Sequence, residues 1–231
     1  MSSTKKPKKS WNEDAGASFF VVERMENMAA AGKICTGFSN PFVAKYSATG
    51  GTVTYSGGMR LARGVEVSIE PEVGDSNPFY ADNVEAETVP GTFTGGTVTL
   101  TVDGLLEEAE QFILGLPAPE SVSYGESKTV DVYSYGDAAE PPYVGIGFLA
   151  RYMSGGVTTW APIVLTKARF QTPSTSAATQ EDQIDWQTQE LTADLMRDDS
   201  AGKVWKKVAA DVTSEEDGLA VLKKILNITE A

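Results

Sequence analysis

The sequence predicts a mainly β protein: an antiparallel β-sandwich or partly closed barrel, with one inserted α-helix at about residues 104–114 and a C-terminal helix. The chain has 22 glycines and many threonines, a composition typical of strands joined by turns. Two segments alternate apolar and polar residues with the period of a strand, and two others have helical spacing. With 231 residues, 41% of them apolar, the chain can bury a core in one large or two small domains.

Residues 1–18 are predicted to form a flexible basic tail, because they are polar and lack periodicity. WNED follows the lysines at residues 11–14, where a signal peptide would need an apolar run, so we expect no secretion. No segment approaches the ~20 apolar residues of a membrane span. Residues 19–31 are ambiguous between a helix and a strand, and residues 19–212 are assigned to the main β domain.

Residues 43–58 are predicted to be an extended hairpin or long loop outside the core. Two glycine pairs, at residues 50–51 and 57–58, bracket a short alternating run. Such a segment cannot fold alone, so we expect it to reach another subunit and to become ordered there. The inter-subunit contacts predicted in it are Val43, Tyr46, Val53 and Tyr55.

Two strands are predicted at residues 64–70 and 97–102. In the first, Val65, Val67 and Ile69 alternate with Glu66, Ser68 and Glu70, which predicts one buried face and one acidic solvent-facing side. In the second, apolar residues alternate with threonines in the same way.

The predicted internal helix begins after Asp103, which we expect to cap it, and ends at Gly115. Its expected apolar stripe is Leu105, Leu106, Ala109, Phe112 and Ile113. A flexible, turn-rich segment without predicted strands then extends to residues 141–142.

Further strands are predicted at residues 143–152, 160–170 and 184–196, with a short one at 204–208. Thr213 and Glu216 have the spacing of a capping box and predict a C-terminal helix over residues 213–231. One side of that helix carries Leu219, Leu222, Ile225 and Leu226.

The negative charge is concentrated in one part of the sequence. The net charge is −13, and residues 64–127 contain 13 carboxylates and no lysine or arginine. This segment indicates either a solvated face that aids solubility or a surface that repels polyanions or meets a basic partner. Direct binding of nucleic acid by the segment is disfavoured, because affinity for phosphates comes from lysine and arginine.

The sequence predicts no catalytic, cofactor or metal site. It contains no histidine, which removes the commonest general base, the histidine-dependent triads and nearly all zinc sites. The single Cys35 has no disulfide partner within the chain and is expected to be a small buried residue. Neither the glutamates at 107, 108 and 110, the glycines at 145 and 147, nor the aspartates at 194, 198 and 199 match a catalytic, phosphate-binding or calcium pattern.

One segment resembles a known family. The run PEVGDSNPFYADN at residues 71–83, directly after an alternating strand, is similar to the signature of one family of phage major tail proteins, which build the tail tube of long non-contractile tails. The resemblance continues in the same order through residues 96–115, 142–152, 162–172, 174–183 and 185–197, and covers roughly residues 60–200. The lysine tail, the residues before Met59 and the C-terminal helix depart from the family pattern.

The resemblance implies a structural protein of the phage tail, assembled in the host cytoplasm and active without a cofactor or a membrane. Six subunits would form a ring, rings would stack into a tube, and sheets would join across subunits into a continuous barrel. DNA would pass through the lumen without specific binding. Tape-measure, tail-tip and tail-terminator proteins would be the other partners.

Site predictions follow for this assembly. Glu66 and Glu70 are expected to face the lumen, with Glu72 and Glu87 as weaker candidates. Phe79 and Tyr80 are expected to anchor a turn, packing either within the subunit or across an interface.

Two alternatives remain open at this point. The first is another phage ring protein, such as a tail terminator or a head decoration protein, which would form single rings rather than stacks. The second is a carbohydrate-binding β-sandwich with a platform made of Tyr143, Tyr152, Trp160 and Trp186, which a glycan array would detect. An enzyme is the least favoured class.

Overall fold

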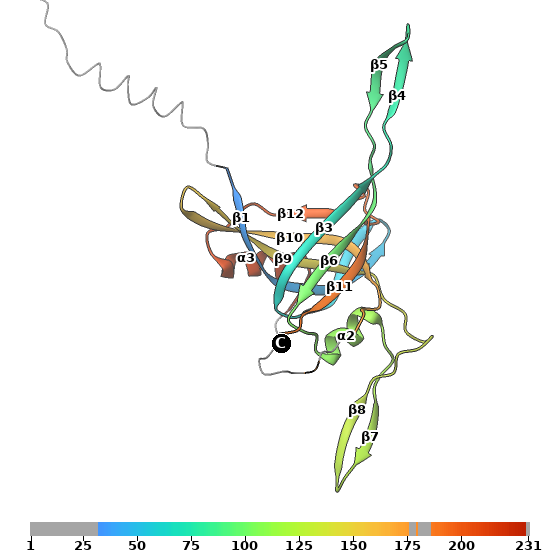
Figure 1. Ribbon diagram of the computed structural model, residues 1–231, viewed down its shortest axis with the longest axis vertical. Helices are drawn as coiled ribbons and strands as arrows, with labels where there is room; N and C mark the ends of the chain where they lie inside the picture. Colours follow the sequence, from blue (N-terminus) through green and yellow to red (C-terminus); the bar gives the residue numbers. More distant parts are fainter. Residues whose placement is uncertain (1–31, 176–178, 180–185, 230–231) are drawn as a thin grey trace, which may run out of the picture.

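The computed structural model describes residues 32–175, 179 and 186–229, and it confirms a mainly β, antiparallel, sandwich-like fold with two helices. The main sheet is eight-stranded, with the order β2-β1-β9-β10-β11-β6-β3 and with β12 also paired to β10 (Figure 1). Its strands are β1 Ile34–Thr49, β2 Thr52–Arg60, β3 Gly64–Val73, β6 Phe93–Val102, β9 Val144–Ser154, β10 Val157–Phe170, β11 Gln189–Met196 and β12 Lys206–Val208.

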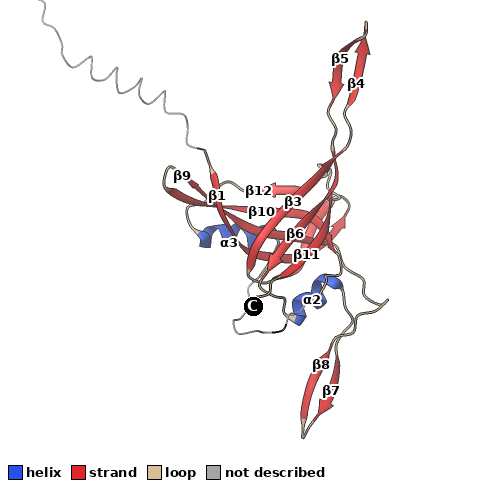
Figure 2. Ribbon diagram, viewed as in Figure 1, coloured by secondary structure: helices blue, strands red, loops and turns tan. Residues whose placement is uncertain are grey.

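Two hairpins form small sheets of their own and extend to opposite ends of the molecule (Figures 1 and 2). One consists of β4 (Asn77–Ala81) and β5 (Val84–Val89), and the other of β7 (Glu120–Tyr124) and β8 (Lys128–Val132). The helices are α2 (Glu107–Leu114) and α3 (Glu215–Ile225). The predicted tail, the ambiguous residues 19–31 and most of residues 174–183 lie outside the described residues.

The main sheet curls so that β3 returns to β1 and encloses the larger hydrophobic core. The Leu61 N–H donates to the Pro41 carbonyl at 2.9 Å. Gly64 lies so close to Phe38 that a Cβ there would be 2.1 Å from the ring. Phe38 in turn packs edge-to-face on Phe148 of β9, with ring centroids 5.4 Å apart. The result is a partly closed barrel.

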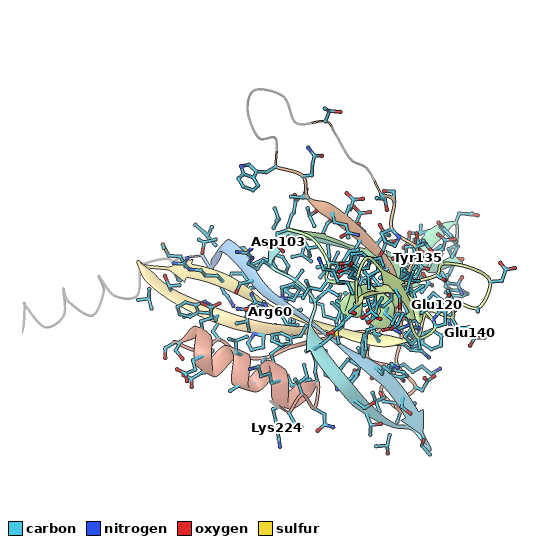
Figure 3. All side chains as sticks on the ribbon, turned by 90° about the horizontal axis from the view of Figure 1, so that it is seen from below. Arg60, Asp103, Glu120, Tyr135, Glu140 and Lys224 are labelled. Atoms are coloured by element: carbon cyan, nitrogen blue, oxygen red, sulfur yellow. The ribbon has the colours of Figure 1, made fainter. Side chains whose placement is uncertain are left out.

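A second core lies on the opposite face of the sheet, where α3 covers β9 and β10 (Figure 3). Leu222 of α3 and Leu226 at its C-cap are fully buried against Leu149 and Val164. The predicted apolar side of this helix is therefore confirmed. The cap is one residue later than predicted, because the Ser214 hydroxyl accepts a hydrogen bond from the Asp217 N–H and the helix begins at Glu215.

The predicted start of the internal helix is wrong. Asp103 does not cap it, because its carboxylate accepts hydrogen bonds from the Arg63 N–H at 3.0 Å and the Arg63 guanidinium at 2.6 Å. Those bonds lower the pKa of Asp103. α2 begins at Glu107, which leaves Leu106 exposed, and it ends as predicted at Gly115 in the left-handed conformation.

The segment at residues 43–58, predicted as an extended hairpin or long loop outside the core, is a hairpin, but it is an ordered part of the main sheet. It forms most of the β1–β2 hairpin, paired from Phe42 and Arg60 to Thr49 and Thr52, with a turn at two glycines of positive φ. Tyr55 is buried and donates from its hydroxyl to the Thr166 carbonyl at 2.8 Å, and burial raises its pKa. The apolar contacts that stabilise this hairpin are therefore in its own subunit.

Gly145 and Gly147 of β9 allow Tyr55 of β2 and the leucines at α3 to lie close to the β9 backbone. A Cβ at Gly147 would lie 2.7 Å from Leu222 of α3 and from its C-cap residue Leu226, and one at Gly145 would lie 2.5 Å from the Tyr55 ring. These glycines make room for packing.

We expect Gly147→Val to lower the free energy of unfolding by about 1–3 kcal/mol, because two fully buried leucines must move. Gly37→Val in β1 is the matched control, since a Cβ there meets nothing closer than 3.8 Å. Urea denaturation of both variants measures the difference. Equal losses of unfolding free energy in the two variants would show that the close approach of α3 to β9 does not contribute to stability.

Candidate assembly surfaces

The outer side of β3, β6 and β11 forms a continuous polar surface, which we call the hydroxyl–carboxylate face. Strand pairing aligns its residues in three rows across the sheet. The rows are Glu66–Thr101–Glu190, Ser68–Thr99–Thr192 and Glu70–Thr97–Asp194. The intervening rows, Val67–Leu100–Leu191 and Ile69–Val98–Ala193, point into the core.

The hydroxyl–carboxylate face has carboxylates at both sides and no cation on its three strands. The nearest positive charge along the rows is Arg169 of β10, which is paired in register with Asp194. Its guanidinium stacks on Tyr143, 4.1 Å from the ring centroid. The face therefore presents hydroxyl groups in a field of fixed negative charge.

Three of the four predicted lumen residues are brought together. Glu66, Glu70 and Glu72 are exposed on the same side of β3. Glu87 lies apart on β5, opposite Phe79. The predicted burial of Val65 is wrong, because the register shifts between Gly64 and Glu66 and leaves this valine exposed.

Sequence reasoning missed Glu190 and Asp194 as members of the face. Their signal is present in the alternation of residues 189–196, where Leu191, Ala193 and Leu195 are buried and the residues between them are not. The contiguous acidic segment, in contrast, is not one surface. Its carboxylates are distributed over β3, the β4–β5 hairpin, α2 and the β7–β8 hairpin.

β2 and β3 are the two ends of the strand order, and neither has a second strand partner among the described residues. An open edge presents unpaired backbone N–H and C=O groups, which pair readily with another strand. On β2, the Tyr55 carbonyl already accepts a hydrogen bond from the Asn227 side-chain amide at 3.0 Å, and the rest of the two edges is available for sheet extension.

The β4–β5 arm is a hairpin with a two-residue turn at Asp82 and Asn83, both at positive φ. Phe79 and Tyr80 lie in its strand β4, not in a turn, and are 64% and 61% exposed. The prediction that these two aromatics pack within their own subunit is therefore wrong. Their contact with another subunit stays a prediction. The arm carries no lysine or arginine.

The β7–β8 arm has one apolar and one polar face. The apolar face carries three cross-strand pairs, which are Val122–Val130, Tyr124–Lys128 and Glu120–Val132. The polar face carries Ser121, Ser123, Thr129 and Asp131. Val122, Tyr124, Val130 and Val132 are 41–54% exposed.

The other predicted inter-subunit contacts lie in or beside the chain's own cores, with Val43 in the larger core and Tyr46, Val53 and Tyr55 in or against the second one. Val43 and Tyr55 are buried, so the predicted contacts at these two residues are wrong. Tyr46 packs against the second core and shares hydrogen bonds of 2.8 Å with Asp199. Burial and the Asp199 carboxylate raise the pKa of Tyr46 to about 12. Tyr46 and Val53 keep part of their surface exposed, and contacts there stay a prediction.

The aromatic residues considered as a sugar platform do not come together. Tyr143 and Tyr152 lie at opposite ends of β9, Trp160 packs near α3, and Trp186 is exposed before β11. Within the described residues, no group of three or more metal-binding side chains is present. No helix in this part of the chain is long and apolar enough to cross a membrane. Neither a protein-family model nor a curated protein matches the chain.

We expect the β7–β8 arm to contribute little to folding, because its two strands pair only with each other. Replacing residues 122–130 by Asn-Gly keeps a hairpin turn after the Ser121–Asp131 pair. The free energy of unfolding should change by less than about 1 kcal/mol. Thermal and urea denaturation of the shortened protein measure this, and a larger loss would show that the arm supports the barrel.

Proposed function

We propose that this protein is a structural, non-enzymatic subunit of a phage tail tube, whose copies form hexameric rings that stack around a conduit for DNA. The number of subunits, the stacking and the tape-measure, tail-tip and tail-terminator partners are implied by the family resemblance. The observation that carries the proposal is the hydroxyl–carboxylate face of β3, β6 and β11.

A conduit for DNA must present a wall that does not hold the phosphate backbone. Lysine or arginine on the wall would displace counterions from DNA and bind it, whereas carboxylates repel it. Glu66, Glu70, Glu190 and Asp194 supply this repulsion, and no cation shares their strands. In a ring, each of these carboxylates is repeated in every subunit.

The covering of the sheet favours this orientation. α3 packs on β9 and β10 and closes the outer face of that part of the sheet. The hydroxyl–carboxylate face has no such cover from a helix of the described chain. We therefore assign this face to the lumen and α3 to the outer wall.

The open edges of β2 and β3 support a closed ring. Pairing of β3 of one subunit with β2 of the next would satisfy both edges and continue the sheet around the ring. The last subunit would then close on the first, so no edge would remain open.

Electron microscopy of the purified protein tests the assembly. We expect rings at intermediate concentration and open-ended stacks at high concentration, because every ring presents the same two faces to its neighbours. Rings that never stack would favour a tail-terminator or head decoration protein. A protein that stays monomeric at all concentrations would contradict the proposal.

We expect Glu66→Lys combined with Glu70→Lys to leave ring formation intact and to make the tubes retain DNA. Retention should be strongest at low salt, where the Debye length exceeds about 10 Å. Asp137→Lys with Glu140→Lys, in the exposed loop before β9, is the matched control with the same charge change. DNA retention is measured with short labelled duplexes on purified tubes. Equal retention by both double variants would place Glu66 and Glu70 outside the lumen.

A further inference from the structure

The β7–β8 arm has an apolar face that no other described part of its own subunit covers. Its four apolar side chains, Val122, Tyr124, Val130 and Val132, remain about half exposed. An isolated two-stranded hairpin is only marginally stable in water. A hairpin with one apolar and one polar face requires a second surface on its apolar side.

A matching groove lies at the base of this arm, between α2 and the β1–β2 hairpin. It has a volume of about 580 Å³, and its apolar walls are Met59, Phe112, Leu116 and Tyr133. Lys45 and Glu108 lie among its remaining lining residues, and the Lys45 ammonium is 5.4 Å from the centre of the Phe112 ring. A groove of this size holds several side chains.

We propose that the β7–β8 arm of one copy inserts its apolar face into the α2 groove of a second copy. The inference deepens the proposed function, because it names a surface by which subunits of the assembly contact one another. The two surfaces match in chemistry. The apolar face has Lys128 near the tip and Glu120 near the base, and the groove offers Glu108 and Lys45 as their opposite charges.

The arm cannot fill the groove of its own chain. Each strand has five residues and rises about 17 Å from the base, away from α2 (Figure 1). A second copy therefore has to supply the occupant. Because the donor and the acceptor are different surfaces, each copy can give its arm to one neighbour and receive an arm from another, so the contact can repeat as a ring or a stack requires.

Cross-linking between two differently labelled proteins tests this contact. In a Cys35→Ser background, one protein carries Tyr124→Cys on the apolar face of the arm and the other carries Met59→Cys in the groove. After mixing and assembly, a short bis-maleimide should join the two different chains. Ser123→Cys, on the opposite face of the same strand, is the matched control and should give at least tenfold less product.

A second measurement uses substitutions that keep the shape of the side chain. Val122→Thr with Val130→Thr should weaken association at least tenfold in sedimentation experiments, because both apolar contacts become polar. Thr129→Val on the polar face should leave association unchanged.

The outcomes separate the inference from the proposed function. Stacked rings without the specific cross-link would overturn the inference and leave the tube proposal standing. The specific cross-link in dimers that never form rings would support the inference and contradict the tube. Equal cross-linking from positions 123 and 124, or no association at any concentration, would overturn the inference.

Discussion

The burial of β9 on both of its faces determines most of this structure. One side of the strand, with Ile146 and Phe148, lies in the barrel core, and the other side lies under α3. Glycines at 145 and 147 allow Tyr55 and the α3 leucines to approach the backbone directly. The β1–β2 hairpin is held against the same second core through Tyr55 and Phe42. α3 therefore covers the half of the sheet that contains β9 and β10, and the half formed by β3, β6 and β11 stays open to solvent.

The open half consists of strands that obey a strict alternation. β3, β6 and β11 bury one side and leave the other to solvent, so each outer residue must be compatible with water. Threonine and serine suit this position because they favour strands and carry a hydroxyl group. The carboxylates at both sides then determine which partners the surface accepts, and polyanions are excluded.

Periodicity predicted most of the main sheet and α3, because a barrel strand or a packed helix has one apolar side that the sequence records directly. It failed where burial does not alternate. The β1–β2 hairpin was predicted to lie outside the core because its apolar contacts are far away in sequence: Val43 packs in the barrel core, and Tyr55 packs on Gly145 and in the core under α3. The β4–β5 arm was missed for the opposite reason, since strands without a core leave no buried side to detect. The strands of the β7–β8 arm do alternate, but each has only five residues and lies in a turn-rich segment. Asp103 was assigned as a cap because its pairing with Arg63, 40 residues away, is invisible locally.

The distribution of charge makes sense only at the level of the fold. A lysine-free stretch of sequence suggests one acidic surface, yet the chain distributes its carboxylates over both arms, a helix and a sheet face. Only on the sheet face are carboxylates from a distant segment, Glu190 and Asp194, added to those of β3. A requirement for solubility alone would be met by acidic residues anywhere on the surface. The β11 carboxylates lie in the same rows as those of β3, with threonines rather than lysines between them, which is the arrangement that the proposed lumen wall requires. The acidic arm and α2 do not share this arrangement, so their charge needs no lumen to explain it.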